Sequence, residues 1–312
     1  MSQRIIIDTD PGQDDAVAIL LALASPEIEV LGITTVAGNV PLALTSRNAL
    51  KICEVAGRPD VKVFAGAARP LQRPLVTAEH VHGRTGLDGP SLPDPVMTLQ
   101  AQPAVDFIIT TLRSEAPGTV TLATLGPLTN VALALAQAPD IAPRIKQVVA
   151  MGGGCFEGGN TTPAAEFNIY VDPEAARAVL AAGIPFTLIP LDCTHQALTS
   201  RARVEALRAL PNRTGPVVAQ LLDFFERYDE EKYGTDGGPL HDPCVIAWLL
   251  RPALFSTREV NVEIECSSPL TRGMTVMDWW RVTDRKPNAT VCGGIDADGF
   301  FTLLTERLAR LP

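Results

Sequence analysis

Apolar strand-like segments alternate with helical segments along most of the chain, and this order restricts the fold more than any other feature. The first unit begins with Ile5–Ile7, a short β-branched run without polar alternation, which is typical of a strand buried on both faces. A Pro11-Gly12 turn follows, and an apolar helical stretch starts at Asp14. Repetition of this order indicates parallel strands joined by right-handed crossovers. The sequence therefore predicts an α/β fold with an open, mostly parallel sheet flanked by helices.

The later segments continue this pattern and then change it. Further strands are predicted at 29–36, 61–64, 119–125, 147–151 and 185–190. Helices are predicted at 42–55, 101–115, 129–137, 173–182, 200–209, 215–231, 245–250 and 299–310. Segments 258–266, 274–282 and 289–293 indicate a small antiparallel C-terminal part. Residues 66–100 are rich in proline and glycine, which predicts a loop-dominated and functional segment. No linker composition divides the chain, so we expect a single domain over residues 1–312.

Composition limits the partners and the compartment. The formal net charge of −9 argues against nucleic acid or an anionic membrane as the main partner. The longest apolar run, 16–24, is too short to cross a membrane, and no secretory signal is visible. The six cysteines are scattered without a Cys-x-x-Cys pair, which is typical of reduced thiols in a cytoplasmic protein.

Four carboxylates, Asp8, Asp10, Asp14 and Asp15, surround the first turn. Aspartate at a helix start often only caps free N–H groups, and one or two such residues would need no other explanation. Four within eight residues repel one another unless protons or a cation intervene. Because Ca²⁺ and Mg²⁺ prefer oxygen ligands, the cluster predicts a hard cation. Its place is the carboxyl edge of the sheet, where open α/β sheets bind ligands.

Polar residues also follow the other predicted strands, at positions that a mostly parallel sheet would bring to one edge. They are Asn39, the Leu125-Gly126 turn, Asn160, Glu166, Asn168 and Asp192, with His241-Asp242 at a helix start. The chain has no Gly-x-Ser-x-Gly elbow and no Gly-x-x-x-x-Gly-Lys-Ser/Thr phosphate loop. Carboxylates and amides suit vicinal sugar hydroxyls, and a carboxylate beside a metal-activated water is a general base. These residue types favour hydrolysis of a sugar-linked bond.

The motifs, taken in order, also resemble a known family. The segments that carry the resemblance are Asp8-Thr9-Asp10-Pro11-Gly12-Gln13-Asp14-Asp15-Ala16, Thr35-Val36-Ala37-Gly38-Asn39, His82-Gly83, Gly86-Leu87-Asp88-Gly89, Leu125-Gly126-Pro127-Leu128-Thr129-Asn130, Met151-Gly152-Gly153, Glu166-Phe167-Asn168 and His241-Asp242-Pro243. They cover nearly the whole chain and are similar to those of the inosine-uridine-preferring nucleoside hydrolases. The resemblance implies a Rossmann-like fold and Ca²⁺-dependent hydrolysis of the N-glycosidic bond of ribonucleosides. The products would be ribose and free base, in nucleoside salvage or catabolism.

The resemblance implies roles for individual residues around the metal and the sugar. The Ca²⁺ ligands that it implies are Asp10, Asp15, Asp242 and the backbone carbonyl of Leu125, where some relatives carry threonine. It also implies Asp10 as the general base. The residues that it places on the ribose are Asp14 and Asn168, with Asn39 close by, and Asn160 and Glu166 at the 5′-hydroxyl.

For the leaving base, the resemblance implies His241 as the proton donor, because imidazole exchanges a proton near neutral pH. Family members with histidine at this position form the subgroup with pyrimidine or broad specificity. That subgroup predicts uridine and cytidine as substrates, with inosine as a further candidate. His82 is expected to contact the base, and Tyr228 and Tyr233 to close over it. The family also implies a homo-oligomer, either a tetramer or a dimer.

Two residues near these motifs receive lesser roles. Asp8 is expected to orient the Pro11-Gly12 turn or the surroundings of Asp10. His195 follows another strand end, and we expect it to be a loop histidine that packs or caps.

Two other functions remain open. Asp8-x-Asp10 at a strand end is also similar to the haloacid-dehalogenase-like phosphohydrolases, although the Pro11-Gly12 turn and the Asp14-Asp15 pair fit that chemistry poorly. The other alternative is a nucleoside- or ribose-binding protein without turnover. The joint presence of the aspartates and His241 argues against it. Release of ribose or of phosphate from nucleosides and nucleotides separates the two enzymes.

Overall fold

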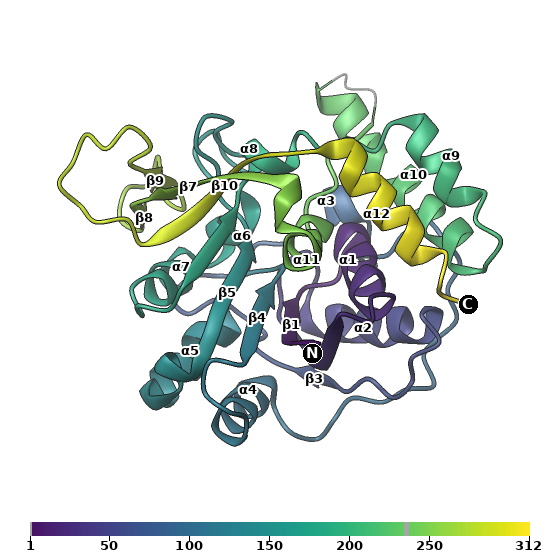
Figure 1. Ribbon diagram of the computed structural model, residues 1–312, viewed down its shortest axis with the longest axis horizontal. Coiled ribbons are helices and arrows are strands. Elements are labelled where there is room, and N and C mark those ends of the chain that lie inside the picture. The colour runs from purple at the N-terminus through teal and green to yellow at the C-terminus, as the bar shows by residue number, and fades with distance from the viewer. Residues whose placement is uncertain (1, 234–236) are drawn as a thin grey trace.

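The computed structural model describes residues 2–233 and 237–312, with the side chains of 228–233 outside the description. Figure 1 shows a central sheet with helices on both of its faces. The strands of this sheet are β1 (Gln3–Thr9), β2 (Ile28–Thr35), β3 (Val63–Ala65), β4 (Val120–Thr124), β5 (Ile145–Met151), β6 (Phe186–Ile189), β7 (Phe255–Val260) and β10 (Ala289–Ile295). Their spatial order is β3-β2-β1-β4-β5-β6-β10-β7. Neighbouring strands of this sheet are parallel, except that β10 and β7 are antiparallel.

Two hydrophobic cores lie on opposite faces of the sheet. The helices are α1 (Gln13–Leu23), α2 (Leu42–Val55), α3 (Glu79–His82), α4 (Ala104–Ser114), α5 (Thr129–Gln137), α6 (Phe167–Val171), α7 (Pro173–Leu180), α8 (Leu191–Thr194), α9 (Arg201–Arg208), α10 (Thr214–Tyr233), α11 (Pro243–Leu250) and α12 (Ala297–Leu308). One core packs under α1, α2, α10, α11 and α12. The other packs under α4, α5 and α7. Burial on both faces explains why the central strands are apolar without alternation.

Every residue of helix α1 is buried, and from Ala16 onward the helix is apolar on every side. It packs against α2, α10, α11 and α12. Each fully buried aliphatic side chain contributes about 1.5–3 kcal/mol relative to exposure, so this helix is held firmly. It begins after Gly12, whose N–H donates to the Asp15 carboxylate at 2.9 Å. A tightly packed element therefore carries Asp14 and Asp15 in its first turn.

The strand order reverses at β1, with β2 and β3 on one side and β4, β5 and β6 on the other. In open α/β sheets, the crevice beyond the strand ends at such a reversal is the usual ligand site. Asp10 comes just after β1, and Leu125 comes directly after β4. The Leu125 N–H donates to the Asp8 carbonyl at 2.8 Å. The topology thus brings two predicted site residues to one crevice.

The predicted architecture is confirmed, with different boundaries late in the chain. The segment predicted as one strand at 258–266 is divided into β7 and β8 (Val262–Ile264). The strand predicted at 274–282 is shorter, since only β9 (Thr275–Met277) forms, pairing antiparallel with β8. Segment 66–100 is irregular except for α3. Within the two described ranges, no helix is long and apolar enough to cross a membrane.

Candidate active site

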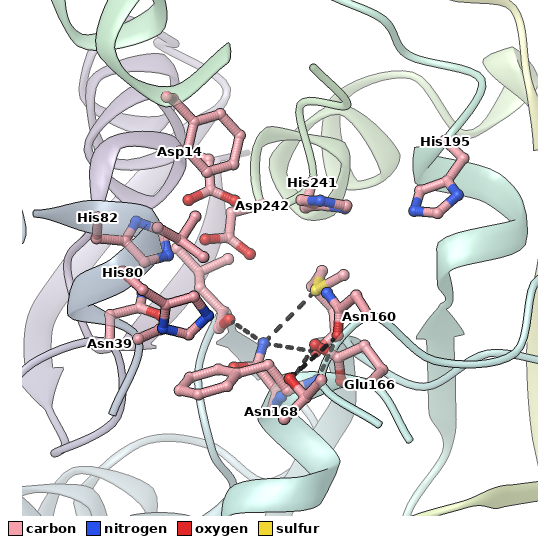
Figure 2. Close-up of a pocket in the computed structure, with 17 residues that line it drawn as sticks. Asp14, Asn39, His80, His82, Asn160, Glu166, Asn168, His195, His241 and Asp242 are labelled. Atoms are coloured by element: carbon pink, nitrogen blue, oxygen red, sulfur yellow. Dashed lines mark hydrogen bonds between the residues drawn. The ribbon is translucent and has the colours of Figure 1, made fainter. Parts of the chain in front are cut away.

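A pocket lies at the strand-order reversal, and most of the predicted site residues line it (Figure 2). Those residues are Asp14, Asn39, His82, Leu125, Asn160, Glu166, Asn168, His241 and Asp242. They come from strand ends and helix starts that are far apart in the sequence. Asp10 and Asp15 are fully buried and do not line the pocket. The side chains of Tyr228 and Tyr233 lie outside the described residues, so their predicted contact with the base stays a prediction.

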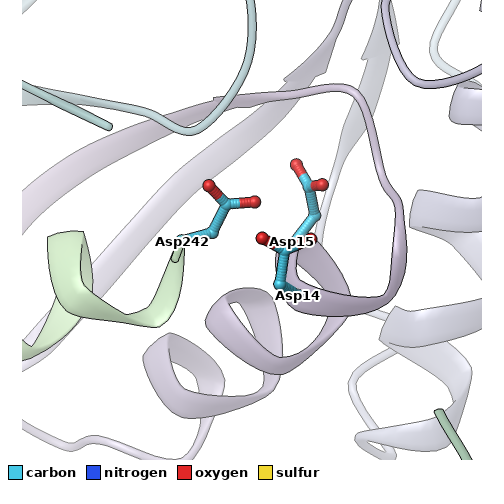
Figure 3. A group of neighbouring side chains, drawn as sticks. All are labelled: Asp14, Asp15 and Asp242. Atoms are coloured by element: carbon cyan, nitrogen blue, oxygen red, sulfur yellow. The ribbon is translucent and has the colours of Figure 1, made fainter. Parts of the chain in front are cut away.

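Three carboxylates meet beside the pocket, two of them in its lining. Asp14 and Asp15 stand in the first turn of α1, and Asp242 is the residue before α11 (Figure 3). One oxygen from each carboxylate lies within 4.8 Å of the other two. Helices α1 and α11 pack against each other, which holds the three groups together. We call Asp14, Asp15 and Asp242 the carboxylate cluster.

Burial makes ionisation of this cluster costly. Loss of solvent, followed by the charge of Asp15, raises the pKa of Asp14 to about 8. Burial and the neighbouring aspartates also raise the pKa of Asp242 well above its usual value. A cation between the carboxylates would remove their mutual repulsion and lower these pKa values. The donor set, made of carboxylate oxygens alone, fits a hard divalent cation.

Asp10 has one carboxylate oxygen that is available to bind a ligand. Its Oδ2 accepts the Asn39 N–H at 2.7 Å, while its Oδ1 is buried with no hydrogen-bond partner among the described residues. A Cβ atom at Gly126 would stand 2.1 Å from Oδ1, so glycine is required for this close approach. Burial and the charge of Asp15 raise the pKa of Asp10 well above its usual value. Burying a carboxylate oxygen without a hydrogen bond costs free energy, and a bound water or cation would offset this cost.

Asn39 joins these carboxylates from the loop that follows β2. Its Nδ2 donates to an Asp15 carboxylate oxygen and to the Asp10 carbonyl, each at 3.1 Å. Asp15 also accepts a hydrogen bond from the Thr9 hydroxyl. Asn39 therefore orients the acids in addition to lining the pocket.

The Leu125 carbonyl faces the same region and already accepts one hydrogen bond. Asn168 Nδ2 donates to it at 2.6 Å and also approaches the Met151 carbonyl at 3.3 Å. A carbonyl oxygen has two lone pairs, so this bond leaves one acceptor site. Asn168 thus positions the carbonyl that the resemblance assigned to the metal.

Glu166 and Asn160 shape the far side of the pocket. Glu166 precedes α6 and accepts N–H groups of Asn168, Ile169 and Gly153. Burial nevertheless raises the pKa of Glu166 to about 7. The Asn160 Oδ1 accepts the Phe167 N–H at 3.0 Å. Both predicted 5′-hydroxyl contacts are therefore rigidly held by backbone donors.

Two buried imidazoles, those of His82 and His241, also line the pocket. His82 is buried on α3, and loss of solvent lowers its pKa to about 3. His241 shares a 2.7 Å hydrogen bond between its Nδ1 and the Thr194 hydroxyl. Burial, followed by the charges of His195 and His82, lowers the pKa of His241 well below its usual value. Both rings are therefore neutral at pH 7.

The sequence matches a family model over residues 5–302, and that model describes inosine-uridine preferring nucleoside hydrolases. The chain belongs to this family. A pyrimidine-specific ribonucleoside hydrolase, RihA, from Salmonella agona is 50% identical over 99% of this chain and 99% of its own length. An uncharacterized protein of Schizosaccharomyces pombe is 58% identical over 99% of this chain and 100% of its own. The predicted family and the hydrolysis of ribonucleosides, an N-glycosidase activity, are thus confirmed.

The fold of this nucleoside hydrolase agrees with solved structures of the family. A purine-preferring ribonucleoside hydrolase from Gardnerella vaginalis has a TM-score of 0.92 and 34% identity, covering 98% of both chains. An inosine-guanosine nucleoside hydrolase has a TM-score of 0.90 and 28% identity, covering 99% of both chains. The sequence and structure comparisons therefore support the nucleoside hydrolase prediction over the phosphohydrolase alternative.

The nucleoside hydrolase pocket also contains residues for which no place in the site was predicted. His195 ends α8, as expected of a capping histidine, but its ring also lines the pocket, 5.8 Å from the His241 ring. Its Nδ1 lies 3.0 Å from a Glu157 carboxylate oxygen. Phe225 of α10 lies against His82, with ring centroids 5.6 Å apart. The only sequence signal for His195 was its place after Asp192 at a strand end.

Besides Asp10 and Asp15, the strand-end residues Asp8 and Asp192 are also absent from the pocket lining among the described residues. Asp8 accepts hydrogen bonds from the Thr34 hydroxyl and from Asn130 Nδ2, and so joins β1 to β2 and α5. It supports the strand before Asp10, while none of its hydrogen bonds among the described residues reaches the Pro11-Gly12 turn. Asp192 accepts the N–H groups of 155–157 and fixes the loop that leads to Asn160.

Proposed function

We propose that this nucleoside hydrolase cleaves pyrimidine ribonucleosides such as uridine and cytidine, with Ca²⁺ bound beside the carboxylate cluster. The observation that carries the proposal is the convergence of buried carboxylates and neutral imidazoles on one pocket. The name of the RihA relative, at 50% identity, supports a pyrimidine base. The purine-preferring structure is less similar, at 34%. Inosine is the second candidate substrate.

Asp10, Asp15, Asp242 and the Leu125 carbonyl are the proposed Ca²⁺ ligands. The unpartnered Asp10 Oδ1 and the spare lone pair of the Leu125 carbonyl support this set. The three carboxylates that lie closest together include Asp14 instead of Asp10. We assign Asp14 to a ribose hydroxyl because it lines the pocket, whereas Asp10 is fully buried. When bound, the cation supplies positive charge that makes a nearby water more acidic.

The protein side chains perform the remaining chemistry in this proposal. Asp10 takes a proton from the attacking water as general base. Cleavage of the bond between ribose and base develops positive charge on the sugar, as in other glycosyl hydrolysis. Nearby carboxylates stabilise that charge more in the transition state than in the ground state. Asp14, Asn39 and Asn168 would hold the ribose hydroxyls during this step.

Departure of the base requires a proton or strong hydrogen bonds, and His241 is the proposed donor. Its Nδ1 lies against the Thr194 hydroxyl. If that hydroxyl donates to Nδ1, the neutral ring carries its proton on Nε2 and can present it to the base. Asn160 and Glu166 would hold the 5′-hydroxyl, and Tyr228 and Tyr233 would cover the base.

We further propose that residues 1–312 form a single domain in a cytoplasmic homo-oligomer, a tetramer or a dimer. The family match over 5–302, without interruption, supports one domain. Sedimentation equilibrium of the purified protein would decide the oligomeric state.

A nucleoside panel tests the proposal. Ribose release and kcat/KM would be measured for uridine, cytidine and inosine, with and without a chelator, together with phosphate release from uridine monophosphate. We expect the highest kcat/KM for a pyrimidine nucleoside, loss of activity in chelator and recovery with Ca²⁺. Tight binding without turnover would instead support a binding protein. Full activity after complete metal removal would contradict the metal assignment.

A further inference from the structure

Gln13 occupies the first position of α1 and is fully buried between the cluster and α3. Its Nε2 donates to the His82 carbonyl at 3.0 Å and to the Asp88 carbonyl at 3.1 Å. Its Oε1 lies 2.7 Å from His82 Nδ1. One amide side chain therefore holds both the backbone and the ring of His82.

These contacts fix the orientation of the amide. A carbonyl oxygen can only accept a hydrogen bond, so the NH₂ group of Gln13 must face His82 O and Asp88 O. Its Oε1, which is only an acceptor, must then face His82 Nδ1. A hydrogen bond between these two atoms requires the proton on Nδ1.

The surroundings of His82 keep the ring in one place and in one charge state. A Cβ atom at Gly12 would stand 2.4 Å from Nδ1, so this edge of the ring abuts the turn. Phe225 stacks against the ring at 5.6 Å. Because burial lowers the pKa of His82 to about 3, the ring carries a single proton at neutral pH. With that proton on Nδ1, Nε2 is a bare acceptor.

We propose that Gln13 is a positioning residue that holds His82 in its Nδ1–H form, so that Nε2 accepts a hydrogen bond from an N–H of the substrate base. The identity of the ligand as a nucleoside base rests on the function proposed above. Uracil and hypoxanthine offer a ring N–H, and cytosine offers an amino group. His82 then recognises the base but does not protonate it, and leaving-group protonation falls to His241.

The partners of the two imidazoles explain this division. The amide of Gln13 cannot exchange donor for acceptor without facing two carbonyls with its oxygen. The Thr194 hydroxyl beside His241 can either donate or accept. His82 is therefore locked in one tautomer, whereas His241 keeps the freedom that a proton donor needs.

The first test reads the tautomer directly in the wild-type protein. Long-range ¹H–¹⁵N correlation spectra of ¹⁵N-histidine-labelled protein distinguish Nδ1–H from Nε2–H rings. The chain has four histidines, so the signals lost in a His82→Gln variant assign His82. We expect the Nδ1–H pattern between pH 6 and 8. An Nε2–H pattern would overturn the proposal, and this result does not depend on any activity.

The second test uses Gln13→Met, which keeps the length of the side chain but removes the amide. We expect KM for uridine to rise roughly 3- to 10-fold with little change in kcat, because a substrate hydrogen bond is lost. p-Nitrophenyl riboside has no N–H on its leaving group, so its KM should not change. The His82 spectrum should also lose its pure Nδ1–H pattern.

Asn48→Leu is the matched control. Asn48 donates to the Pro11 and Thr85 carbonyls at 3.0 and 2.8 Å, and so joins the same turn to the same loop through hydrogen bonds that do not involve His82. We expect this variant to keep the His82 tautomer and the ratio of the two KM values. An equal change in both variants, or a loss of kcat on uridine at constant KM in Gln13→Met, would overturn the proposal. Absence of ribose release from every nucleoside would instead refute the proposed function.

Discussion

Two sets of groups in the pocket, which we call the carboxylate side and the imidazole side, use burial in opposite ways. On the carboxylate side, loss of solvent raises the pKa values of Asp10, Asp14 and Asp242. On the imidazole side, it lowers those of His82 and His241. Burial favours the neutral form in both cases. The carboxylate side therefore needs a cation to hold its charge, whereas the rings of the imidazole side stay neutral without a counterion.

This difference predicts which substrates each side affects. Groups that act on the water and the ribose should matter equally for every riboside, since each substrate contains the same sugar. Groups that act on the base should matter only when the leaving group is poor. The variants below test that separation, beginning with the largest expected effect.

Asp10→Asn should give the largest loss. The amide cannot accept a proton from water, so we expect kcat to fall by roughly 10²- to 10⁴-fold. The loss should be similar for uridine and for p-nitrophenyl riboside, because both need the attacking water. Steady-state kinetics on the two substrates, in excess Ca²⁺, would measure it.

Calcium binding controls the interpretation of this variant. Isothermal titration of metal-free protein should show that Asp10→Asn still binds Ca²⁺, more weakly than the wild type. Full activity of the variant would disprove the general-base assignment. A large loss on uridine alone would place Asp10 on the imidazole side and remove the distinction between the sides.

His241→Ala should give a smaller and more selective loss. We expect kcat on uridine to fall by roughly 100-fold, at the low end for a general acid, with p-nitrophenyl riboside nearly unaffected. Thr194→Val keeps the ring but removes its 2.7 Å partner. It should reduce uridine turnover roughly 3- to 10-fold in the same selective manner. Equal losses on both substrates in His241→Ala would show that His241 is not the proton donor.

The carboxylate side could be predicted from the sequence, because much of it is local. Asp10, Asp14 and Asp15 lie in one strand-turn-helix segment, and the strand order could be inferred from alternation of the elements. The adjoining crevice at the end of β4 then follows from the topology of an open sheet. Only Asp242 had to come from a distant helix start.

The imidazole side was harder to predict from the sequence, since its parts come from four separate segments. His82 lies on the four-residue helix α3, within a stretch whose irregular backbone has no periodic signal. Phe225 and Thr194 are apolar or neutral residues on helices, and nothing in their local sequence marks a pocket. The role of Gln13 could not be predicted from the sequence either. The three atoms to which it is hydrogen-bonded belong to residues 82 and 88, which are far from it in the sequence.

A change at Glu166 should give the smallest effect of this series. Glu166 is a buried acid that accepts hydrogen bonds from backbone N–H groups, whereas the carboxylate side needs a cation. Its pKa of about 7 in the folded protein exceeds its ordinary value of 4.5. Between these values the folded chain binds a proton that the unfolded chain has lost, so the free energy of unfolding falls as pH rises toward 7 and then levels. Glu166→Gln removes this dependence. The Tm of the wild type minus that of the variant should therefore shrink by roughly 2 °C or more between pH 5 and pH 8, measured by calorimetry in excess Ca²⁺. A difference that stays constant over this range would show that Glu166 is ionised throughout, and that its three backbone donors compensate burial as fully as a cation would on the carboxylate side.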